Sequence, residues 1–134
     1  MSAMQRNKGK AFERFIARAL RELYGDRVRR GWQARDGADA PDVEGTPFHV
    51  ECKHHKRPSV HAAVRQALAD RAKAKDTRPL LVVTRENRGR VVVSFLWEEW
   101  LAAERVRNRM EGHETAALFD SQSKTQNTEG ADEG

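Results

Sequence analysis

Residues 42–53 read Asp-Val-Glu-Gly-Thr-Pro-Phe-His-Val-Glu-Cys-Lys, and this stretch decides the fold. It contains two short strand-like runs, 42–44 and 48–52, on either side of the turn signal Gly45-Thr46-Pro47. Two such runs separated by a turn that contains glycine and proline predict a β-hairpin. We therefore expect the chain to be organised around a pair of adjacent strands.

Side chains alternate between the two faces of a strand, so the second run divides into two sets. One set is apolar and is expected in the core: Phe48, Val50 and Cys52. The other set shares the opposite face: His49, Glu51 and Lys53. Asp42, at the start of the first strand, can fold back beside Glu51. Packing does not require two carboxylates and an amine at one sheet edge, but a divalent metal and an activated water do.

Length and composition bound the class of protein. A chain of 134 residues, 34% charged and 38% apolar, predicts one soluble globular domain with a modest core. We find no apolar run near the roughly 20 residues of a membrane span and no signal-peptide core at the start, so no membrane association is expected. The single cysteine, Cys52, excludes an internal disulfide and suits a reducing cytoplasm, which is the host cytoplasm if the chain is phage-encoded.

The net charge of +5 is unevenly distributed. Residues 112–134 carry five acidic side chains against one lysine, whereas residues 1–111 carry 24 basic and 15 acidic side chains. A basic body favours a polyanionic partner, most often nucleic acid, although a basic surface can also serve solubility alone. We interpret residues 1–111 as the functional domain and 112–134 as an acidic, largely disordered tail.

The remaining elements follow from periodicity. We expect a first helix over 7–24 with one apolar stripe: Phe12, Phe15, Ile16, Ala19, Leu20 and Leu23. Strands are expected over 27–35, 80–84 and 91–96, and helices over 60–75, capped by Ser59, and over 97–111. Glu13 falls on the margin of the first helix's stripe, where a carboxylate is costly unless it reaches water or meets a cation. Gln66 lies with Asp70 on a polar flank of the second helix.

The central stretch has the chemistry of phosphodiester hydrolysis. Asp42, Glu51 and the backbone carbonyl of Cys52 can supply oxygen ligands to Mg²⁺ or Mn²⁺. Such a metal lowers the pKa of a bound water and neutralises charge on a phosphate. Lys53, two residues after Glu51 on the same face, can hold that water and stabilise the transition state.

Pro41-Asp42 followed by Glu51-Cys52-Lys53 resembles the signature of the PD-(D/E)XK nucleases. The resemblance covers residues from about 7 to 96 and implies an α/β restriction-endonuclease-like fold, a mixed central β-sheet flanked by helices. Within the superfamily the chain is most similar to archaeal-type and phage Holliday junction resolvases. These begin with a basic, glycine-containing segment before a helical Glu, here Lys8-Gly9-Lys10 and Glu13.

This resemblance implies roles for individual residues. By carry-over, Glu13 joins the metal site, and Gln66 matches a Gln on the helix after the catalytic strand. It also implies a homodimer that cuts four-way DNA junctions in recombination and repair, with Trp97, Trp100 and the last helix as interface candidates or as ordinary core residues. The expected nucleic-acid-binding residues are basic side chains around this stretch: Arg6, Lys8, Lys10, Arg29, Arg30, Arg35, His55, Lys56 and Arg57.

Two alternatives stay open: a nuclease of the same fold that acts on linear DNA, and a non-catalytic nucleic-acid-binding module. The second is disfavoured because Asp42, Glu51 and Lys53 are all present. A zinc site at Cys52, His54 and His55 is also disfavoured, because these residues lack the spacing of a tetrahedral site.

Overall fold

The computed structural model describes residues 3–31 and 40–112. Its contacts divide the chain into two compact units, Met1–Leu96 and Trp97–Gly134, which are described separately. The elements of the first unit are α1 (Ala3–Tyr24), β1 (Arg29–Arg30), β2 (Val43–Glu44), β3 (His49–His54), α3 (Val60–Lys73), β4 (Leu80–Arg85) and β5 (Val91–Ser94).

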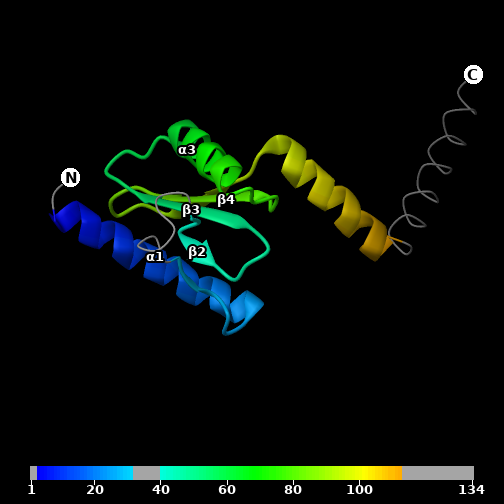
Figure 1. Ribbon diagram of the computed structural model, residues 1–134, viewed down its shortest axis with the longest axis horizontal. Coiled ribbons are helices and arrows are strands. Elements are labelled where there is room, and N and C mark those ends of the chain that lie inside the picture. Colours follow the sequence, from blue (N-terminus) through cyan, green and yellow to red (C-terminus); the bar gives the residue numbers. More distant parts are fainter. Residues whose placement is uncertain (1–2, 32–39, 113–134) are drawn as a thin grey trace, which may run out of the picture. The chain divides into compact units, whose positions relative to one another are not determined.

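The strands form one mixed sheet in the order β1-β2-β3-β4-β5. β3 and β4 pair in parallel, and the other neighbours are antiparallel. Parallel strands need a long crossover connection, and α3 supplies it. Figure 1 shows α1 and α3 on opposite sides of the sheet. The expected α/β restriction-endonuclease-like fold, a mixed sheet flanked by helices, is confirmed.

Each face of the sheet has its own core. Toward α1, Val50 and Cys52 of β3 pack with apolar residues of the helix and neighbouring strands: Phe12, Ile16, Ala17, Val28, Val43, Leu81 and Val83. Toward α3, Leu80 and Val82 of β4 pack against Ala63 and Ala67. The strand β4 is therefore covered on both sides, as its continuous apolar sequence predicts.

The hairpin predicted from residues 42–53 is present, with Val43 of β2 opposite Val50 of β3. Gly45 in its turn has a φ of +83°, and a Cβ there would lie 2.3 Å from the backbone oxygen of Arg27. Glycine is required on both counts. The turn is closed by Thr46, whose hydroxyl accepts a hydrogen bond from the amide of Phe48 at 3.1 Å.

The stripe predicted for the first helix is partly wrong. The helix begins at Ala3, and Phe15 and Leu23 are exposed. Its buried face consists of Phe12, Ile16 and Ala17, with Leu20 and Tyr24 packed against the same core. The sheet therefore contacts a face rotated toward Glu13, away from Phe15.

Other boundaries also differ. The strand expected over 27–35 is reduced to Arg29–Arg30 among the described residues, and Arg35 lies outside them. The helix α3 begins after its Ser59 cap as predicted but ends at Lys73, and β5 ends at Ser94. The predicted tail from residue 113 onward lies outside the described part of the chain.

In the second unit, residues 97–112 form a helix, close to the expected 97–111. The rings of Trp97 and Trp100 stack with centroids 5.5 Å apart, and both side chains are exposed within the structure. No helix in the described residues combines the length and the apolarity needed to cross a membrane.

Candidate active site

A cleft of about 390 Å³ opens where α1, β3 and α3 meet. Its walls include all five residues predicted to be catalytic, namely Glu13, Asp42, Glu51, Lys53 and Gln66. Cys52, His54, His55 and Asp70 also line it, together with Gln5, Arg6, Gly9 and Lys10 from the start of α1. The structure therefore brings together side chains that are up to 65 positions apart in the sequence, from Gln5 to Asp70.

The position of Asp42 follows from the shortness of β2. Only two residues long, β2 pairs with β3 at Val50 and leaves the next residues of β3 without a strand partner on that side. The Asp42 carboxylate fills this position, because its Oδ2 accepts a hydrogen bond from the amide of Cys52 at 2.7 Å. Asp42 is thereby held against the backbone of β3 beside Glu51.

The other two carboxylates are paired with cations. Lys53 Nζ lies 3.2 Å from Glu51 Oε1, as expected for neighbours on one face of β3. Arg30 Nε lies 3.2 Å from Glu13 Oε2. The side chains of Glu51 and Glu13 are only 7% and 16% exposed, so these pairs offset part of the cost of burying them.

Burial and mutual repulsion raise the pKa values of the carboxyl groups in the cleft. Burial, followed by the charge of Asp42, raises the pKa of Glu13 to about 7, against the lowering effect of Arg30 and Lys10. Burial and Asp42 likewise raise the pKa of Glu51 to about 7. Burial also raises the pKa of Asp42, opposed by the Cys52 amide and Lys53. Crowded carboxylates of this kind are stabilised in their charged form by a cation.

The donor set fits a hard divalent metal. Within residues 3–31 and 40–112, no three His, Cys, Asp or Glu side chains lie close enough together to share one cation. The ligands would therefore be two carboxylates, with backbone oxygens and water completing the shell. Mg²⁺ commonly binds proteins in this way. A Cys52 thiolate does not belong to this set, because its side chain packs in the core and burial raises its pKa well above the usual value.

Asp70 is a fourth carboxylate of the cleft, and sequence reasoning missed it as a site residue. It is buried, and its charge raises the pKa of both Asp42 and Glu51. Gln66 Nε2 donates to both of its oxygens, at 3.2 and 3.3 Å. The signal was available, since Asp70 follows Ala63 and Ala67 on the buried face of α3 at helical spacing.

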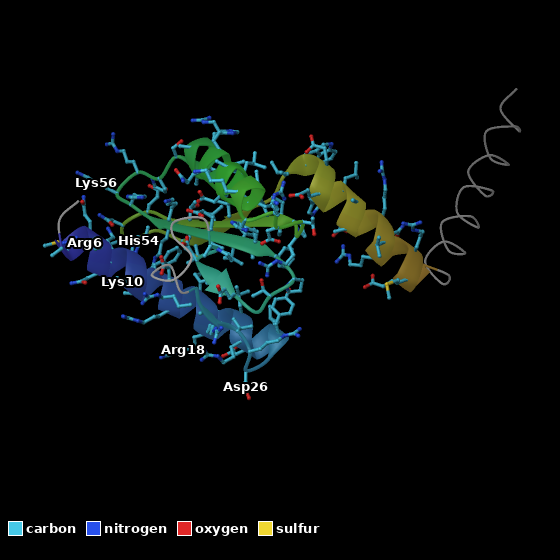
Figure 2. All side chains as sticks on the ribbon, in the orientation of Figure 1. Arg6, Lys10, Arg18, Asp26, His54 and Lys56 are labelled. Carbon is cyan, nitrogen blue, oxygen red and sulfur yellow. The ribbon has the colours of Figure 1, made fainter. Side chains whose placement is uncertain are left out.

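The predicted nucleic-acid-binding residues are divided among several places. Arg6, Lys10 and His55 line the cleft, and Figure 2 shows Arg6, Lys10, His54 and Lys56 at one end of this unit. Lys56 and Arg57 are exposed in the loop after β3. Three more are held by other side chains: Lys8 donates to Asn87, Arg29 pairs with Glu44, and Arg30 pairs with Glu13 at the cleft.

A mixed sheet flanked by helices, with Asp42, Glu51 and Lys53 at one strand edge, has the architecture of a PD-(D/E)XK nuclease domain. Comparison with protein families agrees. The chain belongs to the family described as "Phage putative PDDEXK endonuclease", whose model matches residues 4–129. No curated protein and no solved structure matches the chain significantly. Nucleases of this superfamily generally use divalent metals.

Proposed function

We propose that this chain is a metal-dependent DNA endonuclease that hydrolyses phosphodiester bonds in the cleft between α1, β3 and α3. The observation that carries the proposal is the convergence of Asp42, Glu51, Lys53 and Glu13 on one cleft in a basic unit. Membership of a phage endonuclease family supports it. The site of action that we propose is the host cytoplasm.

Asp42 and Glu51 would hold the cation, Mg²⁺ or Mn²⁺, with the backbone carbonyl of Cys52 as a further oxygen donor, and Glu13 would act on it through a bound water. A cation bound there supplies Lewis-acid stabilisation of the phosphate and lowers the pKa of a water. Lys53, free to leave Glu51 when that carboxylate is neutralised, orients the attacking water and stabilises charge on the phosphate oxygens. Gln66 acts as a positioning residue, because it holds the Asp70 carboxylate through two hydrogen bonds.

We further propose that the substrate is branched DNA, above all the four-way junction, and that the active form is a homodimer. The support is the basic, glycine-containing segment near the start of α1, which lines the cleft. Gly9 and Lys10 line the same cleft as Glu13, in the order seen before the helical Glu in junction resolvases. A two-fold axis would present two such clefts to two symmetric phosphates.

The test is incubation of the purified chain with a labelled four-way junction and with a linear duplex of matched sequence, each with Mg²⁺ and with a chelator. We expect Mg²⁺-dependent cutting of the junction at two symmetric positions and little cutting of the duplex. Equal cutting of both would contradict the junction proposal and favour a nuclease of linear DNA. Binding of DNA without cutting of either substrate would contradict the enzyme and favour a non-catalytic binding module.

A further inference from the structure

A second cleft, of about 290 Å³, lies beyond the loop that follows β3. It is formed by the start of α3, by β4 and by the β4–β5 turn region, and it is lined by Arg57, Pro58, Val60, Thr84, Glu86, Arg90 and Val92. It shares no lining residue with the candidate active site. No role in the proposed hydrolysis accounts for it.

The start of α3 gives this cleft a positive electrostatic end. The 14-residue helix has no acidic residue in its first turn. Ser59 satisfies the amides of Ala62 and Ala63 through its hydroxyl and carbonyl oxygens. Val60 lines the cleft, and its amide precedes the first helical hydrogen bond and so adds to the positive end of the helix dipole.

Two guanidinium groups reinforce that field. Arg57 and Arg90 line the cleft and are exposed. Neither makes an ion pair with any residue in the described part of the chain, including Glu86, the one acidic residue of the lining. The local side-chain charge therefore favours an anion.

Thr84 is the independent sign of a ligand. Its residue is only 3% exposed, yet it lines the cleft, and its hydroxyl has no hydrogen-bond partner within residues 3–31 and 40–112. The hydroxyl is not among the fully enclosed unpartnered atoms of the described residues, so it is accessible, and an oxyanion in the cleft could accept a hydrogen bond from it. The neighbours of Thr84 on β4 that point toward α3, Leu80 and Val82, are apolar, so packing on this face does not require a hydroxyl.

We propose that this second cleft binds a backbone phosphate of the DNA at a position away from the scissile bond. The proposal rests on the proposed function only in taking DNA as the ligand. The two clefts flank the same loop: His55 lines the first, Arg57 lines the second, and the amide of His55 donates to the carbonyl of Arg85 at the end of β4. Lys56 is exposed between them. One DNA segment that crosses this loop would contact both clefts.

The experiment measures the affinity of each variant for duplex DNA over a series of salt concentrations, in a chelator so that no cutting occurs. Arg90→Gln should weaken binding and reduce the slope of log affinity against log salt by about 1, the value for one lost phosphate contact. Thr84→Val should weaken binding by about two- to tenfold and leave the slope unchanged. Glu86→Gln should strengthen binding. Arg18→Gln, on the exposed side of α1 and away from the end that holds Arg6 and Lys56, is the control with the same charge change.

The result that overturns the proposal is an Arg90→Gln variant that matches Arg18→Gln in both affinity and slope, with Glu86→Gln unchanged. Calorimetry with inorganic phosphate alone separates a DNA phosphate from a free one. Saturable binding of inorganic phosphate with no effect of Arg90→Gln on DNA would overturn the assignment to DNA. Because these measurements contain no metal, they stand whether or not the chain cuts DNA, and far-ultraviolet circular dichroism checks that each variant is folded.

Discussion

The Asp42 carboxylate has a structural role on β3 and also lies where it could bind a metal. It satisfies the amide of Cys52, and it lies in the cleft with two further buried carboxylates. Asp42→Asn separates these contributions, because the amide oxygen of Asn can still accept the Cys52 hydrogen bond but the charge is lost. We expect a folded chain whose cutting rate falls by at least about 100-fold. DNA affinity should change little, because phosphate contacts elsewhere carry most of it.

The control for Asp42→Asn is Glu44→Gln on the same hairpin. Glu44 pairs with Arg29 near the surface at 3.5 Å, and surface pairs contribute little to stability. It should cut at the parental rate, whereas Glu51→Gln should fail like Asp42→Asn. Single-turnover cleavage assays compare the three, and parental rates for both cleft variants would show that the site is wrongly assigned.

The raised pKa of Glu13 makes the stability of the metal-free chain depend on pH. An unfolded Glu loses its proton near pH 4.3, whereas burial raises the folded pKa of Glu13 to about 7. Between these values the folded chain binds more protons than the unfolded chain, so the free energy of unfolding falls as pH rises and is level above about pH 7. The melting temperature in a chelator should therefore decrease over this range, and Glu13→Gln should flatten that decrease.

A divalent metal should oppose this decrease in melting temperature with rising pH, because it binds carboxylates only when they are deprotonated. Mg²⁺ should raise the melting temperature more at about pH 7.5 than at about pH 5.5. Thermal scans of the parental chain and Glu13→Gln, with Mg²⁺ and with a chelator, test both statements. Parallel profiles for the two proteins would contradict the buried, proton-binding state of Glu13.

For single residues, the sequence predicts the chemical role better than it predicts the burial and contacts of the side chain. Asp42, Glu51 and Lys53 were identifiable because three residue types at one spacing have few structural explanations. Asp70 was overlooked although it continues the spacing of Ala63 and Ala67, because an acidic residue on a helix is usually solvated, and its burial depends on the sheet packed beneath α3. The sequence places Glu13 on the margin of the apolar stripe of its helix. Only the packing of Ile16 and Ala17 against the sheet brings it into the cleft.

At the scale of elements, the loop between α3 and β4 is hydrogen-bonded to the β2–β3 hairpin. Asp76 Oδ2 lies 3.0 Å from His49 Nδ1 and 2.6 Å from Arg78 Nη2, and Arg78 in turn donates to the carbonyl of Thr46. His49 is fully buried on β3, two residues before Glu51. This network therefore joins the start of β3, the hairpin turn and the connection from α3.

Asp76→Asn should weaken this junction of elements. It removes the charge in hydrogen bonds to Arg78 and His49, and we expect a loss of about 1.5–3 kcal/mol in the free energy of unfolding. The hydrogen bonds from Arg78 hold the pKa of Asp76 well below its usual range, so this contribution is present above about pH 4 and is lost as pH falls further. Urea unfolding at about pH 7 measures the loss. Asp26→Asn, exposed after α1, is the control and should change stability by less than about 0.5 kcal/mol.

The order and type of the elements were predictable, but the rotation of the first helix was not. Apolar residues occupy two neighbouring ridges of α1, Phe12-Ile16-Leu20 and Phe15-Ala19-Leu23. Helical periodicity makes them one broad stripe and cannot choose the part that faces a partner. The sheet contacts the first ridge, which leaves Phe15 and Leu23 exposed. Strand ends were also misplaced, because a strand ends where its partner ends.

At the scale of the whole molecule, charge is separated along the chain. Residues 1–111 are strongly basic and residues 112–134 are acidic, and the family match extends to residue 129, beyond the predicted nuclease domain. An acidic segment tethered to a basic domain is present at a high effective concentration and can compete with DNA phosphates for the same cations. We therefore expect the basic segment to raise DNA affinity and the acidic segment to lower it.

Deletion of residues 121–134 tests this competition, because it removes three acidic side chains and one lysine. We expect the shortened chain to bind duplex DNA several-fold more tightly at low salt, and the difference to vanish at high salt, where charges are screened. The matched control keeps the length and replaces Lys124, Glu129 and Glu133 by Gln and Asp132 by Asn, so that it removes the same charges as the deletion. It should reproduce the effect of the deletion, since charge is the proposed cause. Tighter binding by the deletion alone would instead assign the effect to bulk, and no change in either protein would show that the acidic segment does not compete with DNA.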